Sequence, residues 1–506
     1  MPEQIFGLRP KRSGVPTVKS NNTIPATLDL TQSLETFKQT IIKELSLSDI
    51  SQWDGRTFRE REQKIRQAGL ELAGQCIALL LNNLSQSPEA MKTAHKQTQG
   101  WRRPKSQGNG RVERQVLCNG NVLVSLRLPY VVERSNKVGL NRRKIKGQGF
   151  CPFLRWLSME EGITPLVWSK VAFHGSVSGS FAIAQQALVD WGIAMSVRRV
   201  ERLTYHFNQQ GLSVRNSQVY HFQTGTLAIT PVLKGHRVVI SVDGGRTRIR
   251  ENKTGKRRQQ SNRHRYQGEW TEPKLLTIYV VDEQGKRVNS AEIPVTNDGT
   301  YGKLQPFLSL LEMHLVRLGI NSASQVLLIA DGAKWIWQHI PPLLLRLGGS
   351  LPSIQGLLDF YHATEHLRTF AEAAFTQSNQ QQAWFKQARS TLQRGKSANL
   401  LAQMQALNEK MHGERRSIMT KEIQYFSKFH QQGYLSYSQV AAMNMPIGSG
   451  AIESLIRQVV NLRLKGNGKF WLLENAEAIL HARCHWAAGN WSTFCDSILT
   501  ARLYPS

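Results

Sequence analysis

The chain has 506 residues, a net charge of +29 from 65 Lys and Arg against 36 Asp and Glu, and an isoelectric point near 10.2. This length predicts two to four domains. No apolar run approaches the roughly 18 residues of a membrane span, and no apolar leader follows Met1. The charge excess therefore indicates a nucleic-acid partner in the cytoplasm, and the alternative is a basic soluble protein without a special partner.

The N-terminal third of the sequence changes from helical to β-rich patterns. Residues 1–110 are predicted as a polar tail, then helices, then a basic Gly/Ser/Gln-rich linker over 85–110. Residues 111–160 are predicted as a β-hairpin module, because two β-rich runs meet at Asn119 and Gly120, which favour a type I′ turn.

Residues 161–235 form a third predicted segment, a helix-turn-helix-like DNA-binding region. Gly192 can end its first helix and Ser196 can cap the second, so the link between them is short. The alternative is an ordinary helical hairpin. The cations that the second helix can present to DNA are Arg198, Arg199 and Arg202.

From residue 236 the pattern becomes α/β. Buried strands, including one over 287–296, and amphipathic helices follow in the order β-β-β-α-β-α-β-α, the layout of a ribonuclease-H-like fold. The predicted fold is therefore α/β, with a ribonuclease-H-like catalytic core over 236–365, an all-helical insertion over 366–445, and C-terminal helices over 446–506.

Three carboxylates occupy positions where such a core would bring them together. Asp243 and Asp331 each end an apolar strand, and Glu453 lies one turn into a helix after Gly450. The first and fourth strands of this layout are neighbours, so their carboxyl ends converge. Each residue also has a structural alternative: Asp-Gly is common turn chemistry, and Glu453 can pair with Arg457 one helical turn later.

A carboxylate cluster of this kind suits phosphodiester chemistry. Mg²⁺ prefers hard oxygen ligands, and two ions can activate an attacking oxygen and stabilise the leaving one. We expect two Mg²⁺ (or Mn²⁺) ions, with Asp243 bridging both, Asp331 holding one and Glu453 the other.

The motifs around these carboxylates resemble bacterial insertion-sequence DDE transposases of the ISKra type. The resemblance covers roughly residues 115–490 and implies a ribonuclease-H-like domain whose three acidic residues are Asp243, Asp331 and Glu453. The segments that carry it are VDGGRTRIR (242–250), WTEPKLLTIYVVDEQGK (270–286), ADGAKWIW (330–337), LDFYHATEHL (358–367), PIGSGAIES (446–454) and RLKGNGKFW (463–471).

The resemblance also bears on two further site residues and on a possible zinc site. It implies that Asp359 supports the site and that His362 contacts the scissile phosphate or orients a carboxylate; a structural histidine is the alternative. Similar transposases carry paired cysteines after the hairpin, whereas Cys118 and Cys151 are isolated here. We therefore expect no structural zinc.

Further cations and one aromatic residue lie close to the carboxylates in sequence. A solvated loop and core packing are the alternatives for them, but we expect phosphate clamping and base stacking. The candidates are Arg257, Arg258, Arg263 and Arg265 after Asp243, Trp335 after Asp331, and Arg457, Arg463 and Lys465 along and beyond the helix of Glu453.

The sequence thus predicts a DNA transposase that cuts strands at the ends of its element and transfers them into target DNA. Its partners are double-stranded DNA, as terminal inverted repeats and target, and at least one further copy of the chain. A bacterial cytoplasm, with association with the nucleoid, is the expected location. The alternatives are a ribonuclease-H-like nuclease or resolvase without strand transfer, and a domesticated DNA-binding protein that no longer cuts.

Overall fold

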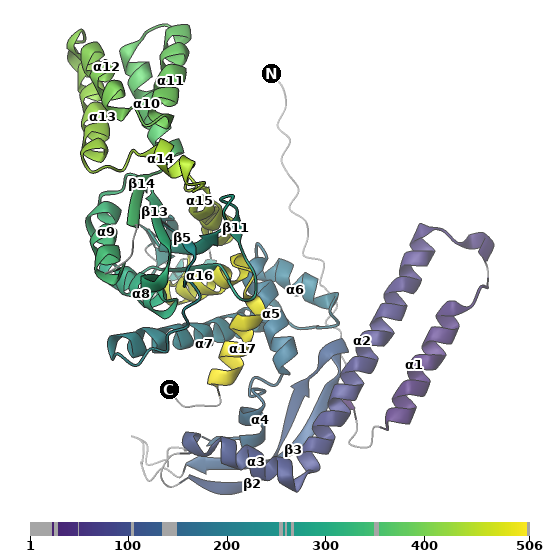
Figure 1. Ribbon diagram of the computed structural model, residues 1–506. Coiled ribbons are helices and arrows are strands. Elements are labelled where there is room, and N and C mark those ends of the chain that lie inside the picture. Colours follow the sequence, from purple (N-terminus) through teal and green to yellow (C-terminus); the bar gives the residue numbers. More distant parts are fainter. Residues whose placement is uncertain are drawn as a thin grey trace. The chain divides into compact units, whose positions relative to one another are not determined.

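The computed structural model describes residues 23–24, 29–48, 50–102, 106–133, 149–251, 257–258, 261–264, 268–348 and 354–502 (Figure 1). The fold is mixed α/β and divides into two compact units. Unit 1 comprises Met1–Gly175, Phe181–Leu203 and Leu499–Pro505, and unit 2 comprises Ser176–Ser180, Thr204–Ile498 and Ser506. Among the described helices, none combines the length and apolar character that a bilayer crossing requires.

Unit 1 is built on an antiparallel hairpin of two long strands. Its strands are β1 (Thr23–Ile24), β2 (Ser106–Leu117), β3 (Leu123–Glu133) and β4 (Gly149–Phe150), and β3 pairs with the other three. The turn between β2 and β3 has positive φ at Gly120 (66°) and Asn121 (61°), the pair of angles that a type I′ turn needs. The predicted hairpin is present, with the positive-φ pair one residue later than expected.

Unit 1 also contains helices. They are α1 (Leu30–Leu45), α2 (Gly55–Gln86), α3 (Pro88–Gln97), α4 (Pro152–Trp156), α6 (Phe181–Val189) and parts of α5 (Pro165–Val177), α7 (Val197–Gln223) and α17 (Trp491–Ala501). Of these, α2 and α4 pack against this hairpin. At Gly74, α2 approaches the hairpin turn so closely that an added Cβ would lie 2.0 Å from the carbonyl oxygen of Asn119. Glycine is therefore required at this contact.

The linker predicted over 85–110 is wrong, because α3, the end of α2, a short 3-10 turn and the start of β2 occupy most of it. Ser87 caps α3 by accepting a hydrogen bond from the Ala90 amide (3.2 Å), and Pro88 stands at its first position. Both are strong helix-start features, which the Gln- and Lys-rich composition of the segment obscured.

Unit 2 contains a six-stranded mixed sheet. The strands are β5 (Arg237–Gly244), β10 (Lys274–Val281), β11 (Arg287–Val288), β12 (Thr296–Thr300), β13 (Gln325–Ala330) and β14 (Ile354–Leu358). Their order is β11-β10-β5-β13-β14, with β12 beside β10; β13 and β14 run parallel to β5, and β10 runs antiparallel to it. The predicted adjacency of the first and fourth strands is confirmed, whereas the strand predicted over 287–296 lies mostly later, at β12.

Helices pack against this sheet. They are α8 (Leu304–Arg317), α9 (Lys334–Gly348), α15 (Gly450–Ile456), which continues into a π-helical turn η5 (Arg457–Asn461), and α16 (Leu473–Ala487). The segment predicted as a helical insertion, 366–445, is helical, but its first helix begins earlier, at residue 360. The helices are α10 (Phe360–Ala374), α11 (Ser378–Gln393), α12 (Ser397–Glu409), α13 (Gly413–Gln431) and α14 (Tyr437–Ala442). The sheet and the insertion share one apolar core, so the insertion is not a separate domain.

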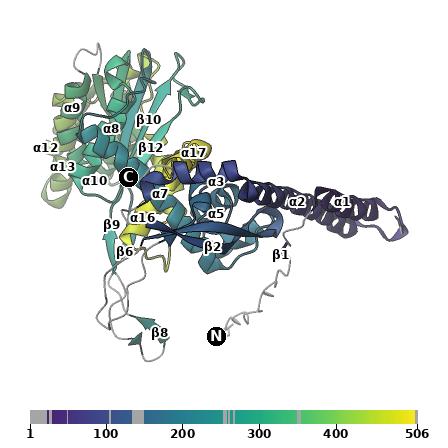
Figure 2. The same ribbon diagram turned by 90° about the horizontal axis from the view of Figure 1, so that it is seen from below.

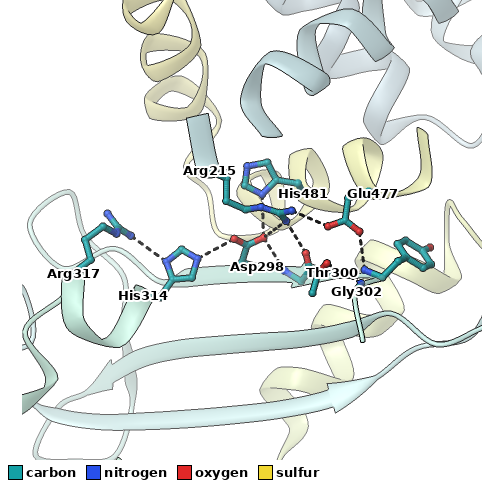
Figure 3. Close-up of polar contacts among 10 residues, drawn as sticks. Arg215, Asp298, Thr300, Gly302, His314, Arg317, Glu477 and His481 are labelled. Carbon is teal, nitrogen blue, oxygen red and sulfur yellow. Dashed lines mark hydrogen bonds and ion pairs between the residues drawn. The ribbon is translucent and has the colours of Figure 1, made fainter. Parts of the chain in front are cut away.

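A buried polar cluster ties β12 to α7, α8 and α16 (Figure 3). Asp298 accepts hydrogen bonds from His314 Nε2 (2.9 Å) and His481 Nδ1 (3.0 Å), and Arg215 lies 3.4 Å from its carboxylate. Arg215 also pairs with Glu477 (2.8 Å). Although burial raises the pKa of Asp298, the charges of His481 and Arg215 and the histidine hydrogen bonds hold it well below its ordinary value. This cluster explains how a strand as polar as TNDGT is buried.

Candidate active site

The first two predicted carboxylates lie level with each other at the carboxyl ends of neighbouring strands. In the parallel pair β5–β13, Ser241 stands opposite Ile329. Continuing this register by two residues brings Asp243 level with Asp331, with both side chains on the same face because side chains alternate along a strand. The arrangement follows from two apolar strands that each end in Asp-Gly.

Hydrogen bonds from the start of α9 fix the backbone and the side chain of Asp331. The indole nitrogen of Trp337 donates to the backbone oxygen of Asp331 (2.6 Å), and the Ala333 amide donates to its carboxylate (3.1 Å). Trp337 is buried and packs against Phe429 and Tyr434, so it serves the core.

Glu453 comes from α15, which packs across β5 and β10. The side chain of Glu453 is exposed, and its recorded hydrogen bond is from Ser449 Oγ (3.4 Å). Among the described residues, Glu453 forms no ion pair with Arg457, so the structural alternative for Glu453 does not apply. A solvent-facing carboxylate at this place is accessible to a ligand.

The three carboxylates and a fourth, Glu272, act on one another electrostatically. Burial, together with the negative charges of Asp331, Glu272 and Glu453, raises the pKa of Asp243 to about 7. The hydrogen bond from the Gly244 amide (2.6 Å) lowers it only in part. Like charges at one place disfavour ionisation. This end of the sheet therefore gathers negative charge, of which the pair between Lys274 and Glu272 (3.8 Å) offsets only the part that belongs to Glu272.

The chemistry of these donors fits a hard divalent cation, which prefers carboxylate oxygens and would relieve their repulsion. Within the described residues, however, no three His, Cys, Asp or Glu side chains are gathered closely enough to form a metal site as they stand. Asp243, Asp331 and Glu453 would therefore have to close together around an ion.

Asp359 is the anchor of this region. It is fully buried and caps α10 by accepting a hydrogen bond from the His362 amide (2.5 Å), while its other carboxylate oxygen accepts one from the Ser449 amide. The Asp359 amide in turn donates to Ala330 (2.7 Å). One side chain thus connects the end of β14 to the loop that leads into the helix of Glu453.

Three stacked or edge-on rings of the insertion end against Gly332, the residue after Asp331. His362 lies edge-on to His366 (5.3 Å between ring centres), and His366 stacks on Tyr425 (3.8 Å). The Tyr425 hydroxyl lies against Gly332, where an added Cβ would be 2.5 Å away. It is buried without a hydrogen-bond partner among the described residues, and burial together with the charges of Asp331, Glu422 and Asp359 raises its pKa.

A two-stranded ribbon follows Asp243 directly. It consists of β6 (Thr247–Arg250) and β9 (Gly268–Thr271), seen side by side in Figure 2. Trp270 on this ribbon is 45% exposed, and the guanidinium groups of Arg246 and Arg248 lie 5.1 and 4.7 Å from the centre of its ring. Arg248 also lies over Phe470 (5.4 Å). The ribbon presents aromatic and cationic groups together.

The sequence did not single out Glu272, Tyr425 or Trp270. Glu272 could have been found by pairing the second strand with the first, since Leu275 stands opposite Asp243, but the long segment between the strands hid that register. Tyr425 lies in the insertion and gives no local signal. Trp270 belongs to the motif WTEPKLLTIYVVDEQGK, and its position shortly after several arginines was the available sequence signal.

The predicted DNA-contacting residues differ in their surroundings. In unit 1, Arg198 is exposed, Arg199 bonds the carbonyl oxygen of Gly162 (3.4 Å), and Arg202 pairs with Glu161 (2.5 Å). The predicted cap of this helix is present, because the Ser196 hydroxyl accepts the Arg199 amide (3.3 Å).

In unit 2, Arg457 and Lys465 are exposed. Arg463 is only 3% exposed, donates to Gly179 (3.3 Å) and lies over Trp471, so it supports the fold and does not offer a surface cation. Trp335 is half-buried against Phe307. The remaining predicted cations are Arg257, Arg258 and Arg263, in the short strands β7 (Arg257–Arg258) and β8 (Ser261–His264), and Arg265, which lies outside the described residues.

Comparison of the sequence with models of known protein families gives no match, and comparison with curated proteins gives no significant relative.

Proposed function

We propose that the chain is a DDE transposase with a ribonuclease-H-like core, which cuts DNA at the ends of its element and joins those ends to target DNA. The observation that carries the proposal is the group of interacting carboxylates at one end of the sheet, formed by Asp243, Asp331, Glu453 and Glu272. Its support is the strand order, with Asp243 and Asp331 level on adjacent parallel strands. The +29 charge of the chain favours DNA as the substrate.

Asp243, Asp331 and Glu453 would hold the divalent ions, Mg²⁺ or Mn²⁺, two per site. Bound ions would activate an attacking water or 3′-hydroxyl and stabilise the leaving oxygen. Burial and the neighbouring carboxylates raise the pKa of Asp243 to about 7, so a proton competes with a cation for this carboxylate near neutral pH. The carboxylate loses that proton when a cation takes its place, so binding depends on pH.

Neighbouring residues supply positioning. Asp359 holds the Ser449 amide and hence the approach to Glu453. The half-exposed ring of His362 can contact a phosphate oxygen or orient a carboxylate. Trp270 with Arg246 and Arg248 offers a base-stacking and phosphate-binding surface beside Asp243, a role that the half-buried Trp335 fits less well.

The test is a plasmid that carries the element's inverted repeats, incubated with the full chain and Mg²⁺. Excision with insertion into a second plasmid supports the proposal, cleavage alone supports a nuclease or resolvase, and a mobility shift alone supports a DNA-binding protein. Asp243→Asn should abolish cleavage and retain DNA binding, while the exposed Asp496→Asn should behave as the parent does. Full Mg²⁺-dependent cleavage by Asp243→Asn would exclude the mechanism.

A further inference from the structure

The paired helices α1 and α2 of unit 1 form an arm (Leu30–Gln86) that exposes several large apolar side chains. In α1 the buried residues are polar, Ser33 and Glu44. Leu34 is 47% and Leu45 64% exposed. Figure 1 shows the two helices side by side. Polar groups take part in the contact between them, since Lys64 pairs with Glu44 (3.4 Å), while Phe37 and Ile41 of α1 are half-buried.

The exposed apolar residues follow helical spacing on both helices. In α1 they are Leu30, Leu34 and Leu45. In α2 they are Phe58, Ile65, Cys76 and Leu80, with the half-buried Leu72 between them. Intervals of seven and four residues place such side chains on one face of a helix. Each helix therefore carries an apolar stripe, which the exposed Lys38 interrupts on α1.

Both stripes face the same side of the arm. On α1 the stripe lies about a quarter turn, in the direction of increasing residue number, beyond the contact residues Ser33 and Glu44, at about 100° per residue. On α2 it lies a similar angle beyond Arg61 and Lys64, which contact the end of α1. Because the helices are antiparallel, equal rotations in this sense bring both stripes to one side. The arm is thus half of a four-helix bundle.

Charge distinguishes between the possible occupants of this face. The arm has seven Lys and Arg against seven Asp and Glu, in a chain whose net charge is +29. A neutral apolar face offers little to a DNA backbone, which is bound through cations. It is compatible with a second copy of itself, since an isologous contact pairs α1 with the α2 of the other copy around a two-fold axis.

We propose that this face is a dimerisation surface that binds the same face of a second copy of the chain. The α1–α2 overlap is about 24 Å long and about 20 Å wide, so it buries on the order of 500 Å² per copy. That is at the low end for a specific interface. The dimer should therefore form reversibly at micromolar concentrations, without DNA.

The experiment is sedimentation equilibrium of the full chain at 1 to 100 µM without DNA, for the parent and for Leu34→Glu with Ile65→Glu. The parent should shift from monomer to dimer across this range, and the double variant should stay monomeric. The matched control is Leu345→Glu, since Leu345 is 64% exposed on α9; it should dimerise as the parent does. Circular dichroism confirms that each variant is folded.

Cys76 provides a second readout within the native sequence. It is the exposed cysteine, and the other four are buried. Maleimide labelling of Cys76 should slow at least threefold between 1 and 100 µM in the parent and stay constant in the double variant. A monomeric parent at 100 µM, a double variant that still dimerises, or equal loss of dimer in Leu345→Glu would each overturn the proposal. None of these outcomes depends on whether the chain cuts DNA.

Discussion

Ionisation of Asp243 should cost the metal-free protein stability, and Asp243→Asn should remove that cost. The pKa of Asp243 rises from its ordinary 3.8 to about 7 because of burial and of the charges of Asp331, Glu272 and Glu453. About three pH units at 1.36 kcal/mol each correspond to roughly 4 kcal/mol. Solvent at the half-buried side chain reduces this figure, so we expect about 1–4 kcal/mol.

The sign follows from proton linkage. The folded state binds the Asp243 proton more tightly than the unfolded state, so its stabilising contribution is complete below about pH 4 and is lost as the pH rises through 7. With EDTA present, Asp243→Asn should therefore equal the parent near pH 4.5 and exceed it in stability at pH 8.5. The exposed Asp496→Asn should change neither value.

Hydrogen exchange of the β5 and β13 amides is the suitable assay, because it reports on unit 2 even if the two units unfold separately. Mg²⁺ at 100 times its dissociation constant should stabilise the parent by about 2.7 kcal/mol and the Asn variant by less. Calorimetry in buffers of different ionisation enthalpy should show proton release on binding near pH 6.5. An Asn variant that is less stable than the parent at pH 8.5 in EDTA, or a difference that does not vary with pH, would refute the reasoning.

Three further substitutions test the supports of the fold. Asp359→Ala should lower the free energy of unfolding by about 3–5 kcal/mol, as it leaves a helix start uncapped and the buried Ser449 amide unpaired; urea denaturation followed by tryptophan fluorescence would show it. Asp298→Asn should cost about 3–5 kcal/mol at pH 7, because it removes the buried negative charge beside Arg215 and weakens the hydrogen bonds from His314 and His481. Since the folded pKa of Asp298 lies below its unfolded value, that cost should shrink as the pH falls below about 4 in melting experiments. Gly74→Ala should destabilise unit 1 by more than 2 kcal/mol, as its methyl group meets a backbone carbonyl, and limited proteolysis between α2 and β3 would detect it.

The sequence predicted those parts of unit 2 that depend on apolar periodicity. Two runs of β-branched and leucine residues ending in Asp-Gly were enough to place Asp243 and Asp331 on neighbouring strands. The insertion was predicted as helical because its segment is polar, helical in pattern and without strand signals. Local chemistry also predicted the caps, as at Ser196, because a cap depends on a few adjacent residues.

The failures occurred where tertiary contacts override local composition. The strand β12 has the sequence TNDGT, which no propensity scale favours, and it is buried because Asp298 finds its histidine and arginine partners on three other elements. Tyr425 contacts Gly332, the residue after Asp331, from a helix some ninety residues away in sequence. The burial of Arg463 depends on carbonyl partners distant in the chain. Each case requires long-range pairing that a single sequence does not contain.

The surroundings of three aspartates in unit 2 distinguish carboxylates that stabilise the fold from a carboxylate available for function. Asp298 is matched by an arginine and two histidines, and Asp359 by two backbone amides, so both satisfy their charge within the protein. Asp243 receives one amide from its own neighbour and otherwise faces carboxylates. A fold that can satisfy two buried carboxylates so fully has the means to satisfy a third. Because the charge of Asp243 has no cationic partner among the described residues, its ionisation lowers the stability of the fold. A cation bound from solution would offset that loss and complete the site.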